Sequence, residues 1–149
     1  MESAVFSCPA SWRGYLPHGV RGLDHPRDLA GRNWEALALT RRGRDSLGAV
    51  LPSCRILLAP GDSLPEIPAE TVITYGLSPR DSLTLSSREG DTLWAALQRE
   101  LVTVEGRVVE RQEFPLALRP GEEELSALAA AGALLLLGVP PEELGDVLD

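Results

Sequence analysis

Residues 54–59, Cys-Arg-Ile-Leu-Leu-Ala, decide the fold class, because such an apolar run is typical of a buried strand. A Pro-Gly-Asp turn at 60–62 ends this strand. A second strand is predicted at 71–76, Thr-Val-Ile-Thr-Tyr-Gly, and an alternating third strand at 82–87, Ser-Leu-Thr-Leu-Ser-Ser. The centre of the chain is therefore expected to form a sheet.

On the N-terminal side of this centre the pattern is more mixed. Residues 4–9 read as a short strand that ends at a proline, and residues 10–33, rich in Gly, Pro and Arg, as irregular structure. Residues 34–40 fit a strand or a helix, with the alternation favouring a strand. The arginine-rich residues 41–44 are expected to end that element, and residues 45–51 to form one or two helical turns.

On the C-terminal side, residues 92–104 contain both helix formers and a strand-like end. Residues 101–104 and 108–114 read as a hairpin around Gly106, so we predict a long two-stranded ribbon. Residues 92–104 remain open between strand and helix.

Two helices are predicted to close the chain. Residues 122–137 begin with acids, which the helix dipole favours, and Gly138 ends the apolar run. A second helix starts with proline at 140–141. We therefore expect residues 1–149 to form a single α/β domain, with a mixed sheet, a β-ribbon and a C-terminal helix pair.

The charge pattern limits the partners. The net charge is −8, and seven acids with no base follow residue 121. This predicts no nucleic-acid partner, because no basic face would neutralise phosphates. All 14 basic residues are arginine, so the Gly-Lys-Ser/Thr phosphate-binding motif is missing and no cofactor is predicted. No apolar run reaches membrane-spanning length and the N-terminus lacks a basic leader, so we expect a soluble cytoplasmic protein without a membrane partner.

A Gly-Asp-Ser-Leu string at residues 61–64 follows the central strand. It resembles the signature of the GDSL esterases, in which the serine, here Ser63, is the nucleophile. That family also has a histidine after the serine, whereas His18 and His25 both precede it. Without a base the hydroxyl is a poor nucleophile. The alternative interpretation is a turn that ends a strand.

Asp24 and His25 are the one neighbouring pair of an acid and a histidine in the sequence. Such a pair can hold a metal ion or orient an imidazole. The alternative is a surface turn, because the pair stands in a segment rich in Pro and Gly.

Asp62 and Glu66 flank Pro65 in the loop after the central strand. Ligands of α/β proteins bind beyond the carboxyl ends of strands, so these carboxylates are candidates for binding a ligand such as a cation. Residues 41, 42 and 44, all arginine, are similarly a candidate for binding one anion. In both cases a solvated loop is the alternative. Cys8 and Cys54 are expected to be reduced thiols.

Two segments together resemble the central domain of the Mur ligases, ATP-dependent amide-forming enzymes of peptidoglycan synthesis. Residues 72–78, Val-Ile-Thr-Tyr-Gly-Leu-Ser, are similar to a strand late in that domain, and residues 126–144 to the helix pair that closes it. Residues 22–25, Gly-Leu-Asp-His, resemble the Asp-His motif that helps to hold magnesium in that family. The chain departs from the family in lacking the P-loop and in having Glu122, Glu123 and Glu124 where asparagine and histidine are usual.

The resemblance implies a trimmed relative that keeps the scaffold and has lost ATP chemistry. We therefore expect a non-catalytic binding or interaction domain of the bacterial cytoplasm, with a peptide, another protein or a second copy as partner. One alternative is a small serine hydrolase that uses Ser63. Another is a subunit that a partner chain completes by supplying the P-loop.

Overall fold

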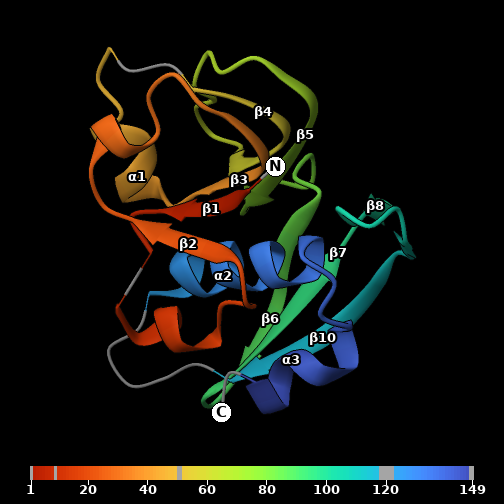
Figure 1. Cartoon of the computed structure of the whole chain (residues 1–149). Coiled ribbons are helices and arrows are strands. Elements are labelled where there is room, and N and C mark those ends of the chain that lie inside the picture. The colour runs from red at the N-terminus through yellow and green to blue at the C-terminus, as the bar shows by residue number, and fades with distance from the viewer. Residues whose placement is uncertain (1, 9, 50–51, 118–122, 148–149) are drawn as a thin grey trace.

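The computed structural model describes residues 2–8, 10–49, 52–117 and 123–147. Within these ranges eight strands form one mixed sheet, in the order β10-β7-β6-β5-β4-β3-β1-β2 (Figure 1). The strands are β1 (Ser3–Phe6), β2 (Val20–Leu23), β3 (Asn33–Leu39), β4 (Ser53–Pro60), β5 (Ala69–Gly76), β6 (Leu83–Glu89), β7 (Thr92–Leu97) and β10 (Gln112–Ala117). The protein is thus an α/β protein built on a mixed sheet, as the sequence predicts.

Six neighbouring strands of this sheet are parallel, from β2 at one edge to β6, and their carboxyl ends share one edge. β7 runs antiparallel to both β6 and β10. The chain moves from β1 to β2 in one direction and then crosses back to β3 on the other side of β1. The strand order therefore reverses between β1 and β3.

The connections between the parallel strands cover opposite faces of the sheet. Trp12 and Leu16, between β1 and β2, pack in the same cluster as the helix α2 (Glu124–Leu136). Leu29, Leu47 and Ile67, in the connections that lead to β3, β4 and β5, pack in the cluster on the other face. This alternation of faces is what right-handed crossovers produce when the strand order reverses.

The apolar run of β4 is buried on both faces, as the sequence predicts. Ile56 and Leu58 belong to the cluster beneath α2, and Leu57 and Ala59 to the opposite cluster. In α2, Gly132 sits directly over this strand, and a Cβ built there would lie 2.9 Å from a methyl carbon of Leu58. The helix and the sheet are therefore in close contact at this point.

Two predictions on the N-terminal side are corrected by the structure. The segment 10–33 contains the parallel edge strand β2, which its glycine and arginine content concealed. The predicted turns at 45–51 start earlier, as helix α1 (Arg41–Ser46), because Thr40 caps it and accepts a 3.0 Å hydrogen bond from the Gly43 amide. Residues 34–40 are confirmed as the strand β3 rather than a helix.

The predicted long ribbon is also corrected. The hairpin around Gly106 exists only as the short strands β8 (Leu101–Val102) and β9 (Val108–Val109). Residues 92–97 form β7, a strand of the main sheet, because Leu93, Ala95 and Leu97 alternate into the core. The segment 108–114 is divided between β9 and β10, and β10 pairs with β7.

The C-terminal helix pair is present as α2 and α3 (Pro141–Val147). α2 is buried continuously from Ala127 to Leu136 and lies across the sheet, whereas α3 packs beside β10 (Figure 1). The Pro-Gly pair at 120–121, which stands between the predicted ribbon and the first of the two predicted helices, falls outside the described residues. In the part of the chain that the structure describes, no helix is both long and apolar enough to cross a membrane.

Candidate functional site

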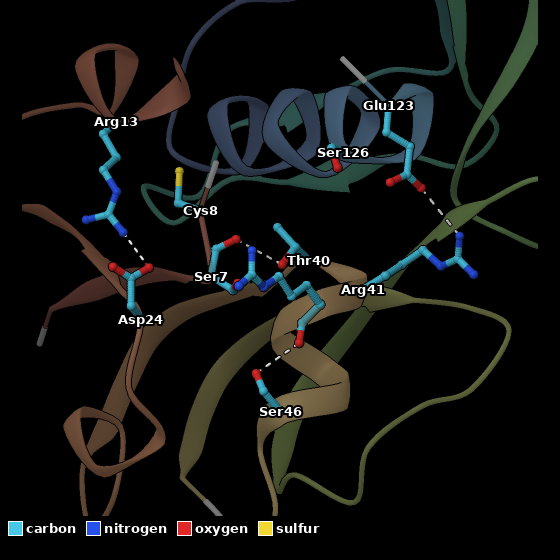
Figure 2. Close-up of a pocket in the computed structure, with 10 residues that line it drawn as sticks. Ser7, Cys8, Arg13, Asp24, Thr40, Arg41, Ser46, Glu123 and Ser126 are labelled. Carbon is cyan, nitrogen blue, oxygen red and sulfur yellow. Dashed lines mark hydrogen bonds and ion pairs between the residues drawn. The ribbon is translucent and has the colours of Figure 1, made fainter. Parts of the chain in front are cut away.

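A cavity of about 690 Å³ opens at the carboxyl ends of β1 and β3 (Figure 2). This is the point where the strand order reverses and the flanking connections leave on opposite faces, which is where open α/β sheets place their ligands. The lining combines hydroxyl and thiol groups with charged groups: Ser7, Cys8, Thr40, Ser46 and Ser126, and Arg13, Asp24, Arg41, Arg42 and Glu123. Below we call this space the first cavity.

The backbone around the first cavity is held by Thr40. Its hydroxyl donates a 3.0 Å hydrogen bond to the Ser7 carbonyl, and its oxygen caps α1. Ser7 has a φ of 57°, a left-handed conformation that is unusual for a residue other than glycine. Its amide donates a 2.7 Å hydrogen bond to the Leu23 carbonyl, so this turn is tied to the end of β2 as well as to β3.

α1 packs directly on the end of β1 through Gly43. A Cβ built at Gly43 would lie only 2.6 Å from the Phe6 carbonyl oxygen, so a glycine is required for this approach. The approach brings Arg41 and Arg42, in the first turn of α1, to the rim of the first cavity.

The charges in the first cavity leave an excess of one cation. Arg13 and Asp24 form an ion pair with a 2.5 Å N–O distance, and Arg41 lies 3.5 Å from the Glu123 carboxylate. Among the described residues, Arg42 has no acid within ion-pair distance. Three guanidinium groups therefore face two carboxylates, which favours an anionic ligand.

A second cavity of about 500 Å³ lies at the carboxyl ends of β4 and β5. Its lining includes apolar side chains, among them Leu77 and Leu125, and also the charged residues Asp62, Arg80 and Asp81. Arg41 lines both cavities, so the two spaces are adjacent at this residue.

Asp81 is buried in the lining of the second cavity, with a residue exposure of 5%. Its Oδ2 accepts a 3.1 Å hydrogen bond from the Ser78 amide. The carboxylate lies against the backbone of Gly61 and Gly76, where a Cβ would come within 1.8 Å and 2.5 Å of its oxygens. Two glycines at the ends of adjacent strands thus make room for one carboxylate.

Ser63 is not in the lining of the first or the second cavity. It lies in a separate shallow cavity with Arg44, Asp45 and Glu66, and among the described residues lining that cavity there is no histidine. Its carbonyl oxygen accepts a 3.3 Å hydrogen bond from Arg44. The Ser63 side chain thus has no imidazole beside it in this cavity to act as a base.

Asp24 and His25 do not share a cavity lining. Asp24 lines the first cavity and is paired with Arg13, whereas His25 is not part of that lining. Within the described ranges, no group of three or more His, Cys, Asp or Glu side chains is placed to hold a metal ion.

Asp62 and Glu66 line different cavities. Asp62 lies in the second cavity, where a 2.5 Å hydrogen bond from Arg44 lowers the pKa of its carboxyl group. Glu66 lies beside Ser63. The three arginines of the predicted anion site are divided in the same way, because Arg41 and Arg42 face the first cavity and Arg44 binds Asp62.

Sequence reasoning missed Ser7, Arg13, Glu123 and Asp81. Ser7, Arg13 and Glu123 come from three distant segments that meet only in the folded chain. Asp81 carried a weak signal, since Gly61 stands in the turn after the first predicted strand and Gly76 ends the second.

Cys8 and Cys54 are both free and buried. Burial raises the pKa of each thiol to about 11, because the thiolate loses its hydration. At pH 8 only about one thiol in a thousand is then ionised, and the thiolate is the reactive form.

We therefore expect both thiols to react slowly with an aromatic disulfide reagent at pH 8. In guanidinium chloride both thiols are expected to react rapidly and to completion. The measurement is the rate of release of the coloured thiolate under native and unfolded conditions. Fast native reaction of either thiol would contradict this burial.

Together these features define an α/β protein with two adjacent cavities along the carboxyl edge of a parallel sheet segment, at and beside a reversal of strand order. Comparison of the chain with protein-family models and with curated proteins gives no match.

Proposed function

We propose that this chain is a non-catalytic binding domain, and that its ligand is a small molecule with an anionic group held in the first cavity. The observation that carries the proposal is the position of Arg42, a cation without an acidic partner among the described residues, in a cavity at the reversal of strand order. Arg13 and Arg41 are each paired with an acid but still offer N–H donors to the cavity, and the hydroxyls of Ser7 and Thr40 add polar groups.

Two features of the site support binding rather than catalysis. The Cys8 thiol in the first cavity is protonated at neutral pH, because burial raises its pKa to about 11. Ser63 lies in another cavity, whose described lining contains no histidine. Neither residue has the activated form that covalent catalysis requires.

The relationship to the Mur ligase central domain remains part of this proposal. In its support, the resembling segments take the forms expected of them: residues 72–76 lie in β5, and residues 126–144 span most of α2 and the start of α3. The chain contains no lysine, so a relative of this kind would hold its anion with arginine.

The proposal is tested by titrating the intact chain with inorganic phosphate and, separately, with acetate at low ionic strength. Binding is measured by chemical-shift changes in the backbone amide spectrum. We expect saturable shifts at Ser7, Thr40 and Arg42, and Arg42→Gln is expected to weaken binding about tenfold, because it removes a charge-assisted hydrogen bond.

The matched control is Arg107→Gln, which removes the same charge from the exposed β8–β9 hairpin outside both cavities. It is expected to leave binding nearly unchanged. Equal weakening by both variants would indicate a general charge effect. That result, or a lack of saturation in the unmodified chain, would overturn the proposed site.

A further inference from the structure

The second cavity differs in character from the first. Leu77 and Leu125 contribute apolar side chains to it, and Pro60 and Tyr75 are also in its lining. Leu77 is 69% exposed, an unusual degree for a leucine in a cavity lining, whereas Leu125 is partly buried against the main core. An exposed leucine beside a cavity is a surface that an apolar ligand group can cover.

The charges of the second cavity do not favour a second anion. Arg41 and Arg80 are matched there by Asp62 and Asp81. The Asp81 carboxylate is buried and faces the strand ends, and Arg44 is already bound to Asp62. An anionic group is therefore more stable in the first cavity, where cations are in excess.

Arg41 lines both cavities, and the first turn of α2 borders both, with Glu123 on the first and Leu125 on the second. The two cavities are thus adjacent along the carboxyl edge of the sheet, and a molecule long enough to pass the Arg41 side chain would reach both. Each cavity has a volume in the range of ordinary small-molecule sites.

Building on the proposed function, we infer that the ligand is elongated and amphipathic. Its phosphate or carboxylate head binds beside Arg42 in the first cavity, and its apolar group extends past Arg41 to cover Leu77 and Leu125 in the second. The head supplies the charge recognition, and the apolar group adds affinity by removing exposed leucine surface from water.

The experiment compares ligands that share a head and differ in the apolar group: methyl phosphate with hexyl phosphate, and acetate with heptanoate. Dissociation constants are measured by amide chemical shifts on the intact chain. Hexyl phosphate or heptanoate is expected to bind at least about tenfold more tightly than its short counterpart, because part of the alkyl chain is buried. The stronger of the two series identifies the head group.

The variant Leu77→Ser is expected to remove most of this gain and to leave the binding of the short ligand unchanged. Leu64→Ser is the matched control, because Leu64 is also exposed but lines neither of the two cavities. Leu64→Ser is expected to preserve the tighter binding of the long ligand.

The outcomes separate this inference from the proposed function. If the short ligands bind through Arg42 and the long ones bind no more tightly, the inference is wrong and the proposed function stands. The same conclusion follows if Leu77→Ser preserves the tighter binding of the long ligand as Leu64→Ser does. If none of the four ligands binds saturably, both the inference and the proposed function are wrong.

Discussion

Replacement of Leu58 by alanine is expected to lower the free energy of unfolding by about 3 kcal/mol, as for other large-to-small changes in a rigid core. Leu58 is 0% exposed and lies in the strand β4, beneath α2. Its methyl groups contact the position of Gly132, so their loss leaves a space between helix and sheet that neither can close without moving. Denaturant unfolding followed by circular dichroism measures the change.

The control for this variant is Leu64→Ala, which removes the same atoms from a side chain that is 50% exposed. It is expected to change stability by less than about 0.5 kcal/mol. A second test combines Leu58→Ala with Gly132→Ala in one double variant. Gly132→Ala is expected to destabilise the unmodified chain, because its Cβ would lie 2.9 Å from Leu58, and to cost clearly less beside Leu58→Ala, where only the 3.2 Å approach to Leu83 remains. Strictly additive effects would contradict the contact.

Replacement of Gly61 by alanine is expected to lower the free energy of unfolding by about 3 kcal/mol, the upper end of what overpacking usually costs. The added Cβ would lie 1.8 Å from the Asp81 carboxylate and 3.2 Å from the Thr74 Cβ. The carboxylate is buried and is held by the Ser78 amide, so it has little room to move away. Thermal and denaturant unfolding report the loss.

Gly14→Ala is the control, because a Cβ at Gly14 meets no atom within 4 Å. Gly14→Ala is expected to change the free energy of unfolding only slightly. Asp81→Ala is expected to relieve most of the penalty of Gly61→Ala in the double variant, since it removes the nearest oxygen. If the double variant loses as much free energy of unfolding as the two single variants together, the cost at Gly61 has another origin.

The strands of the centre could be predicted from the sequence because their apolar pattern is local. The run at 54–59 is apolar on both faces of the sheet, and this pattern is visible without knowing its neighbours. β7 could not be assigned in the same way, because residues 92–97 include alanine and leucine, which also favour a helix. Its strand form depends on pairing with β6 and β10.

The site was predictable only in part. The position of cavities beyond the strand ends is expected from the fold class, and the residue at 62 was a candidate for that reason, whereas those at 41 and 42 were candidates as part of a cluster of arginines. Which of the arginines would face the first cavity was not predictable. In the structure Arg44 binds Asp62, whereas Arg42 faces the first cavity. That choice depends on where Gly43 lets α1 meet β1, a contact between residues far apart in the sequence.

The edge strand β10 also limits how copies of this chain can associate. A strand that joins the open side of a sheet needs backbone donors there, and Pro115, opposite Trp94 in the middle of β10, has none. Growth of the sheet from molecule to molecule is therefore disfavoured at this end. If two copies associate, we expect side-chain surfaces to join them rather than a continuous ladder through β10.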